Sequence, residues 1–273
     1  MNSTASAPPS APPGRFRDRF LPLFLLGLLG VATLPLAIAP MVREQQLPPE
    51  IARLPMAVIV ALSLINPTLL LAIGTALGTW LAHRLGLVSH IVRRREAGAP
   101  LRPRLRAELA LAFGLGIIVA IATTLLDLAF APHLGAAWTK AAAELDDEGT
   151  WRGLVGGMLY GGITEELMLR WGFLTLVAWI GWRLFQRRKG VPGPGIMWSA
   201  IILAAVLFGL GHLPAVAAIT PLTSMLVVRT VLLNALAGVV FGWLFWRRSL
   251  ESAMLAHASA HVGFALMALA GVV

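Results

Sequence analysis

Long apolar stretches separated by short polar segments dominate the sequence. Each is near or above the roughly 20 residues that a membrane-spanning helix needs. They cover residues 20–41, 55–82, 107–130, 152–184, 196–213, 220–246 and 250–271. The pattern predicts an all-α fold, a polytopic transmembrane helical bundle of about seven spanning helices.

Composition agrees with a membrane protein. The 273 residues are 58% hydrophobic and 13% charged, whereas soluble domains carry about 25% charged residues. The chain has no cysteine, which excludes disulfides, thiolate zinc sites and cysteine nucleophiles.

The net charge of +9 comes from cations that lie beside the apolar stretches in alternate loops. By the positive-inside rule these loops are cytoplasmic, so seven spans place the N-terminus inside and the C-terminus outside. The cations are Arg15, Arg17, Arg19, Arg84, Arg93, Arg94, Arg95, Arg102, Arg104, Arg106, Arg183, Arg187, Arg188, Lys189, Arg247 and Arg248. The opposite side carries Glu44, Glu50, Glu144, Asp146, Asp147 and Glu148.

The domain organisation is simple. The sequence predicts a disordered basic tail over residues 1–19 and a single membrane domain over residues 20–273. A short amphipathic helix is expected from Ala136 to Leu145, at the outer interface. The basic run 93–106 is typical of juxtamembrane charge facing anionic lipid, so we expect the lipid bilayer and not nucleic acid as its partner.

Two adjacent glutamates and an arginine interrupt the fourth apolar stretch, and ionisable groups are costly in hydrocarbon. On a helix, Glu166 and Arg170 are four positions apart and can pair. Glu165 is turned by about 100° toward a different neighbour. We therefore expect Arg170 to hold Glu166, while Glu165 is free to act as a general base for water. The alternative is an ion pair that only locks helices together, which leaves Glu165 without a partner.

Three of the six histidines fall in later apolar stretches. His257 and His261 are four apart and share a helix face, a spacing that suits a metal ion or two side chains directed into one cavity. His212 lies near the end of the fifth stretch, and by residue count it is nearer the outer side than Glu165 and His257. Helix tilt, or an earlier start of the fourth helix, would have to bring these residues to the same depth. Small residues that permit close helix approach precede the glutamates: Gly156, Gly157, Gly161 and Gly162.

Two further polar residues lie in apolar stretches. Asp127 is expected at the outer end of its helix. For Arg229 the sequence favours an interfacial side chain that snorkels to the surface over one that pairs with a carboxylate.

The order of these motifs resembles the CPBP family of intramembrane glutamic endopeptidases, which includes the type II CAAX prenyl proteases and the bacterial Abi-type membrane proteins. The family pattern is E-E-x-x-x-R, then F-x-x-x-H, then H-x-x-x-N or a variant, on successive membrane helices. The similarity covers about residues 150–265, where the motifs are Glu165-Glu166…Arg170, Phe208…His212 and His257…His261.

The resemblance implies a peptidase with a cavity open to the membrane and the cytosol, acting on a membrane-associated peptide or protein. Glu165 and His212 would activate the attacking water, and Glu166 and Arg170 would support the site. His257 and His261 would stabilise the oxyanion, although asparagine is more common at the position of His261.

The resemblance favours a metal-free glutamate mechanism without a cofactor. The histidine at position 261 leaves a second interpretation open, in which Glu165, His212, His257 and His261 bind zinc. We expect the protein in a bacterial inner (cell) membrane.

Two other functional classes fit buried polar residues. One is a non-enzymatic membrane scaffold or immunity-type protein, in which these residues only join helices. The other is a transporter or proton relay, which is less favoured because the halves show no inverted repeat.

Overall fold

The computed structural model describes residues 14–36, 51, 53–145 and 150–272. Most of the predicted tail lies outside the described residues, as do Glu44, Glu50, Asp146, Asp147 and Glu148. Helix α1 begins at Phe16, so the last residues of the predicted tail are helical.

The described residues form helices and no strand. In chain order they are α1 (Phe16–Val31), α4 (Met56–Leu81), η1 (Ala82–Leu85), α5 (His90–Ala97), α6 (Leu101–Phe130), η2 (Ala131–His133), α7 (Ala136–Leu145), α8 (Thr150–Gly156), η3 (Gly157–Glu165), η4 (Leu167–Leu174), α9 (Thr175–Phe185), α10 (Pro194–Gly211), α11 (Leu213–Ala217), α12 (Ser224–Arg247) and α13 (Leu250–Leu269). The predicted all-α class is confirmed.

Six helical segments within the described part are long and apolar enough to cross a membrane: Phe16–Leu36, Met56–Leu85, Leu101–His133, Pro194–Ala217, Ser224–Arg247 and Leu250–Leu269. The chain is therefore a polytopic integral membrane protein. The predicted span 152–184 is helical throughout but is not among the six. The count of seven stays a prediction.

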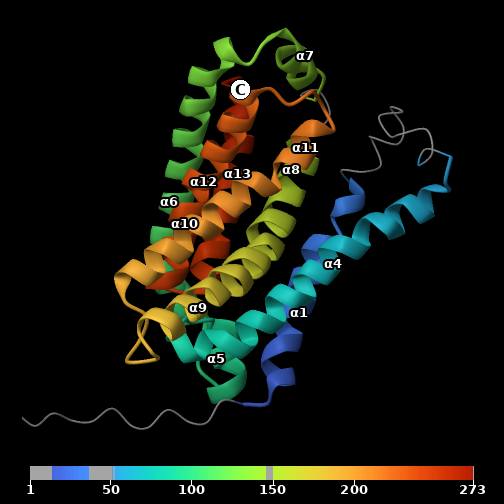
Figure 1. The fold of residues 1–273 in the computed structure, drawn as a ribbon. Coiled ribbons are helices and arrows are strands. Elements are labelled where there is room, and N and C mark those ends of the chain that lie inside the picture. Colours follow the sequence, from blue (N-terminus) through green and yellow to red (C-terminus); the bar gives the residue numbers. More distant parts are fainter. Residues whose placement is uncertain (1–13, 37–50, 52, 146–149, 273) are drawn as a thin grey trace, which may run out of the picture.

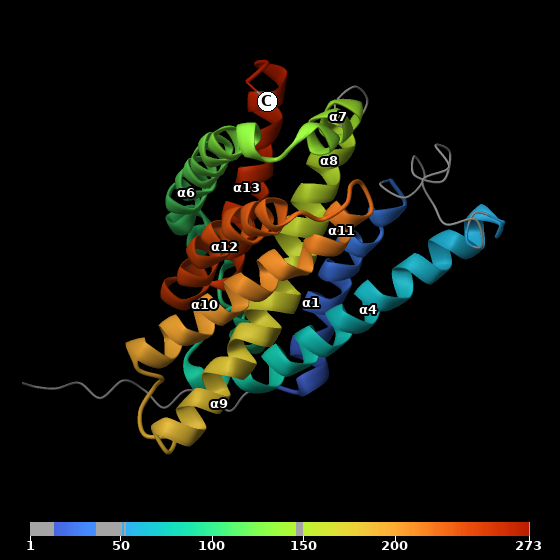
Figure 2. The same ribbon diagram turned by 45° about the horizontal axis from the view of Figure 1, so that its top comes forward.

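Helix α13 lies at the centre of the bundle and packs against α6, η3 and α12, while α10 packs along α12 and α1 lies between η3 and α4. Glycines allow the closest approaches, because a Cβ at Gly116 of α6 would lie 2.2 Å from the carbonyl oxygen of Ala256 in α13. Figures 1 and 2 show α10 crossing the bundle obliquely, and the first half of α4 leaving the other helices. The exposed residues of α4 include Leu62, Ile65 and Leu69, as expected for a helix that faces lipid.

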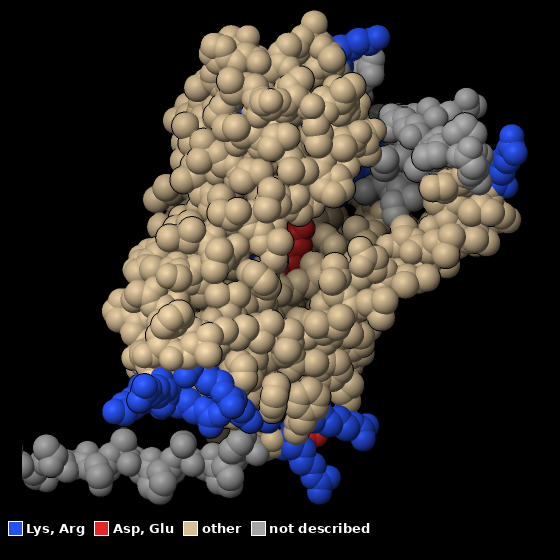
Figure 3. All heavy atoms as spheres, viewed as in Figure 1, with Lys and Arg blue, Asp and Glu red and all other residues tan. Residues whose placement is uncertain are grey.

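Charge is distributed along the bundle axis as the sequence predicted. Figure 3 shows Lys and Arg gathered mainly along the lower edge of the molecule, where α5 and the end of α9 lie in Figure 1. We call this the cationic end; it includes Arg93, Arg94, Arg95, Arg183, Arg187, Arg188 and Lys189. That this end faces the cytoplasm stays a prediction.

The expected amphipathic helix is present as α7, at the end of the bundle opposite the cationic end (Figure 1). The prediction that Arg229 snorkels is wrong. Its Nε donates to Oδ1 of Asp127 at 2.6 Å, and the guanidinium also lies 4.8 Å from the ring centroid of Trp138. A half-buried arginine gains more from this two-pronged carboxylate contact than from solvent, so the pair joins α6, α12 and α7.

Candidate active site

The helix that carries the acidic pair has unusual geometry. Residues 150–185 run from α8 through η3 and η4 to α9 without a break, and both η3 and η4 are π-helical. Glu165 ends the first π segment, and Glu166 lies between the two. Wider π turns are rare and frequently occur at functional sites. Here they set the directions of two adjacent carboxylates.

Glu166 and Arg170 form the ion pair that their spacing predicted. Nη1 of Arg170 lies 3.1 Å from Oε1 of Glu166, and both side chains have 0% exposure. Nη2 of Arg170 donates to the carbonyl oxygen of Gly238 at 3.2 Å. The guanidinium also lies 4.8 Å from the ring centroid of Phe208 and 5.5 Å from that of Phe241, which favours the cation in an apolar core.

His257 of α13 contacts the same carboxylate, that of Glu166. Its Nδ1 lies 2.8 Å from Oε1 of Glu166. The imidazole is stacked on Phe241 at a centroid distance of 4.6 Å and on His261 at 5.2 Å. The contact with Glu166 fixes the ring orientation and directs Nε2 away from the carboxylate.

Glu165 has a different environment from its neighbour. It is half-buried, whereas Glu166 is buried. Within the described part of the chain, no residue forms a hydrogen bond or a close ion pair with it. Figure 3 shows acidic atoms in a hollow at mid-height of the molecule, on the side where α4 leaves the bundle. The structure thus separates an engaged glutamate from an unengaged one, as the sequence predicted.

His212 reaches this region through Phe208. Nδ1 of His212 lies 2.8 Å from the carbonyl oxygen of Phe208, and a carbonyl only accepts, so Nδ1 is the donor and Nε2 of the neutral ring is free to accept. The Phe208 ring contacts His212 at 4.7 Å and His257 at 5.6 Å, between centroids. Helix α10 crosses the bundle obliquely (Figure 1), and the contacts of the Phe208 ring bring His212 and His257 into one region.

Glycines of η3 make room for the two histidines of α13. A Cβ at Gly157 would lie 2.1 Å from Nδ1 of His261. A Cβ at Gly161 would lie 2.9 Å from Nε2 of His261 and 3.2 Å from Nε2 of His257. Both Nε2 atoms thus converge beside Gly161, four positions before Glu165 on the same helix.

The geometry of these side chains does not fit the zinc interpretation. No group of three or more His, Asp or Glu side chains among the described residues is arranged to hold a metal ion. We therefore derive no chemical step through a metal.

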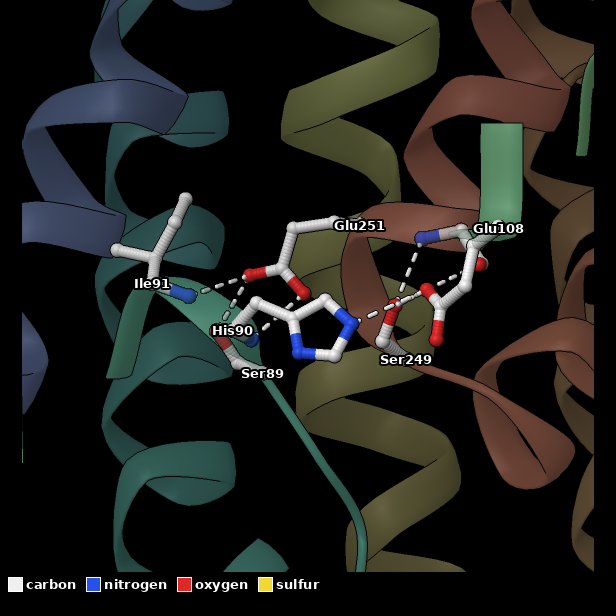
Figure 4. Close-up of polar contacts among 7 residues, drawn as sticks. Ser89, His90, Ile91, Glu108, Ser249 and Glu251 are labelled. Atoms are coloured by element: carbon white, nitrogen blue, oxygen red, sulfur yellow. Dashed lines mark hydrogen bonds and ion pairs between the residues drawn. The ribbon is translucent and has the colours of Figure 1, made fainter. Parts of the chain in front are cut away.

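A second polar cluster, which sequence reasoning missed, joins α5, α6 and α13 (Figure 4). The Glu251 carboxylate accepts from the Ser89 hydroxyl at 2.6 Å and from the backbone N–H groups of His90 and Ile91 at 2.9 and 3.0 Å. These contacts join the start of α5 to the start of α13. Glu251 is buried, although its sequence position at the edge of an apolar stretch is typical of an exposed charge.

Glu108 of α6 completes the cluster. Its Oε2 accepts from the hydroxyls of Ser249 and Ser252 at 2.5 and 2.6 Å, and it lies 3.1 Å from Nε2 of His90. The cluster ties three helices together two turns before His257. The only sequence signal was a serine N-cap beside a glutamate, at residues 249–252.

The comparisons with known proteins bear on the C-terminal part of the chain, which holds the site. Residues 147–263 match the family model of the type II CAAX prenyl endopeptidase Rce1-like proteins. That segment includes every candidate site residue named above, whereas α1, α4, α5 and α6 lie outside it. Comparisons with curated proteins and with solved structures gave no significant match. Residues 147–263 are therefore similar to this family of CAAX-type membrane endopeptidases, in the part of the chain where the order of the motifs predicted the resemblance.

Proposed function

We propose that this protein is an intramembrane endopeptidase that hydrolyses a peptide bond of a membrane-associated peptide or protein, with Glu165 as the base for the attacking water. One observation carries the proposal. Of two adjacent carboxylates, Glu166 is engaged by Arg170 and His257, while Glu165 is half-buried without a hydrogen-bond partner among the described residues. An unengaged carboxylate in a largely apolar setting is suited to accept a proton from water.

In the proposed reaction, Glu165 removes a proton from water, and the water oxygen attacks the carbonyl carbon of the scissile bond. His212 orients the water through the lone pair on Nε2, because its Nδ1 donates to the Phe208 carbonyl. The C–N bond of the tetrahedral intermediate then breaks, and the proton held by Glu165 passes to the leaving amine. The net change is the addition of one water molecule across the peptide bond.

The oxyanion requires hydrogen-bond donors, and the two histidines of α13 differ in this respect. A neutral imidazole carries one N–H. His257 uses its N–H toward Glu166, so its Nε2 donates only in the imidazolium form. His261 has no such partner among the described residues, so a neutral His261 can carry its proton on Nε2. We therefore assign the principal donor role to His261.

The experiment compares Glu165→Gln with Asp18→Asn, an exposed carboxylate at the start of α1. The probes are a fluorogenic farnesylated CAAX peptide, chosen from the family's description, and the same peptide without farnesyl, both presented to the full chain in liposomes. Glu165→Gln should lower kcat by about 10²–10⁴-fold with an unchanged melting temperature. Asp18→Asn should match the wild type. Full activity of Glu165→Gln would support the non-enzymatic alternative instead.

A second comparison addresses the histidine at the usual asparagine position. His261→Asn should keep at least a tenth of the wild-type kcat, because the amide also donates a hydrogen bond. His261→Ala should lose about 10²-fold. Cleavage should also be insensitive to a metal chelator. Loss of activity in chelator that zinc restores would contradict the metal-free mechanism.

A further inference from the structure

A cavity of about 150 Å³ lies at the cationic end, outside the candidate active site. Its walls come from α1, the end of α4, η1 and α5, and Trp171 of η4 also contributes to the lining. The polar residues that line it are Arg19, Thr79, His83, Ser89, Arg93, Glu96 and Trp171. A cavity of this size accommodates a small polar group or several waters.

Two of these residues present buried polar atoms that no described residue engages. Oγ1 of Thr79 and Nε1 of Trp171 have no hydrogen-bond partner among the described residues, and these residues are 2% and 3% exposed. Nε of Arg19 is also buried without a hydrogen bond, although it lies 3.4 Å from Oε1 of Glu96. Buried polar groups are nearly always hydrogen-bonded, because leaving them unpaired costs free energy. The guanidinium and indole groups can only donate, so the cavity is suited to an acceptor.

The charge of the lining selects among acceptors. Arg19 and Arg93 are cationic, and Glu96, which lies 3.4 Å from Nε of Arg19, offsets one of them. Nη1 of Arg19 lies 3.3 Å from Nδ1 of His83. Since arginine only donates, Nδ1 accepts and His83 is neutral in this contact. The lining therefore carries one net positive charge and favours an anion over water.

Position along the bundle axis indicates the source of the anion. The cavity lies in the same end of the bundle as the band of Lys and Arg in Figure 3, the level at which a bilayer presents its phosphates. Basic pockets between spanning helices at this level bind lipid headgroups. We propose that this cavity binds the phosphate group of a membrane lipid.

A phosphate bound in this cavity would also contact the helix that carries Glu165 and Glu166. Trp171 follows Arg170 directly in the chain, and its ring contacts Phe245 of α12 at 6.0 Å between centroids. A phosphate that accepts from the indole N–H therefore ties α1 and α5 to the helix that carries Glu166. The inference does not depend on the proposed peptidase activity.

The test uses the full chain in detergent, titrated with dioctanoyl phosphatidylglycerol and followed by native mass spectrometry. Dioctanoylglycerol, which lacks the phosphate, is the matched ligand control. Arg93→Gln should weaken phosphatidylglycerol binding by about fivefold, the weight of one partly exposed charge contact. Arg94→Gln removes the neighbouring exposed charge outside the cavity and should leave binding unchanged. Trp171→Phe and Thr79→Val should each weaken binding severalfold.

Several results would overturn the proposal. Equal effects of Arg93→Gln and Arg94→Gln would mean that surface charge alone attracts the lipid. If phosphatidylglycerol and dioctanoylglycerol bound equally well, the phosphate group would make no contribution to binding. Thermal stabilisation by millimolar inorganic phosphate but not by phosphatidylglycerol would assign the site to a soluble phosphate. Competition by a peptide with a free C-terminal carboxylate would assign it to a substrate terminus.

Discussion

Nδ1 of His257 lies 2.8 Å from Oε1 of Glu166, the same oxygen that the guanidinium of Arg170 approaches at 3.1 Å. One carboxylate oxygen thus connects α13 to the π-helical region between η3 and η4. The contact fixes the orientation of the His257 ring. It also engages the carboxylate of Glu166, one of the two adjacent glutamates. The other, Glu165, has no hydrogen-bond partner among the described residues, and we propose it as the base.

Removing Arg170 should destabilise the protein strongly. Arg170→Met leaves Glu166 as a buried charge without its cation, so we expect a loss of about 3–5 kcal/mol. The double variant Arg170→Met/Glu166→Leu should recover most of that stability, because no charge is left unpaired. Chemical unfolding in detergent measures both, and the double variant should remain inactive. A double variant no more stable than Arg170→Met would contradict this account.

Two adjacent glycines should respond in opposite ways to alanine. Gly157→Ala places a Cβ 2.1 Å from Nδ1 of His261 and must displace that ring, so we expect kcat to fall about tenfold or more. A Cβ at Gly156 meets nothing within 4 Å. Gly156→Ala should therefore keep full activity and slightly raise helix stability. Similar kinetics of the two variants would exclude a role for the space beside His261.

The cluster in Figure 4 should matter for stability more than for chemistry. Glu251→Gln replaces a carboxylate that accepts three hydrogen bonds with an amide that has one acceptor oxygen. We expect a loss of about 1.5–3 kcal/mol in unfolding free energy. Asp18→Asn is the control, and it should unfold like the wild type. An unchanged unfolding midpoint for Glu251→Gln would show that the cluster does not hold α5 to α13.

The absence of cysteine allows a direct test of orientation. Arg95→Cys lies at the cationic end, and Ala218→Cys lies in the exposed turn after α11. In intact cells an impermeable maleimide should label Ala218→Cys and not Arg95→Cys, if the cationic end is cytoplasmic. Both should be labelled once the cells are opened. The reverse pattern would invert the predicted topology.

The sequence by itself determined the helices, their membrane character and the resemblance of residues 147–263 to a protease family. Runs of apolar residues near 20 in length suffice for spanning helices, and charge clusters at alternate loops predicted the cationic end. The spacing of Glu166 and Arg170 was enough to predict their ion pair, because both lie on one helix.

Only the tertiary structure decided which distant residues meet. His257 and Glu166 are 91 positions apart, Arg229 and Asp127 are 102 apart, and Glu251 and Ser89 are 162 apart. Periodicity along a helix shows which residues share a face, but the neighbour of that face depends on tilt and close packing between helices. That is why the snorkelling assignment for Arg229 failed, and why the cluster around Glu251 and Glu108 was not found. The same packing, through the oblique course of α10, brings His212 and Phe208 toward His257.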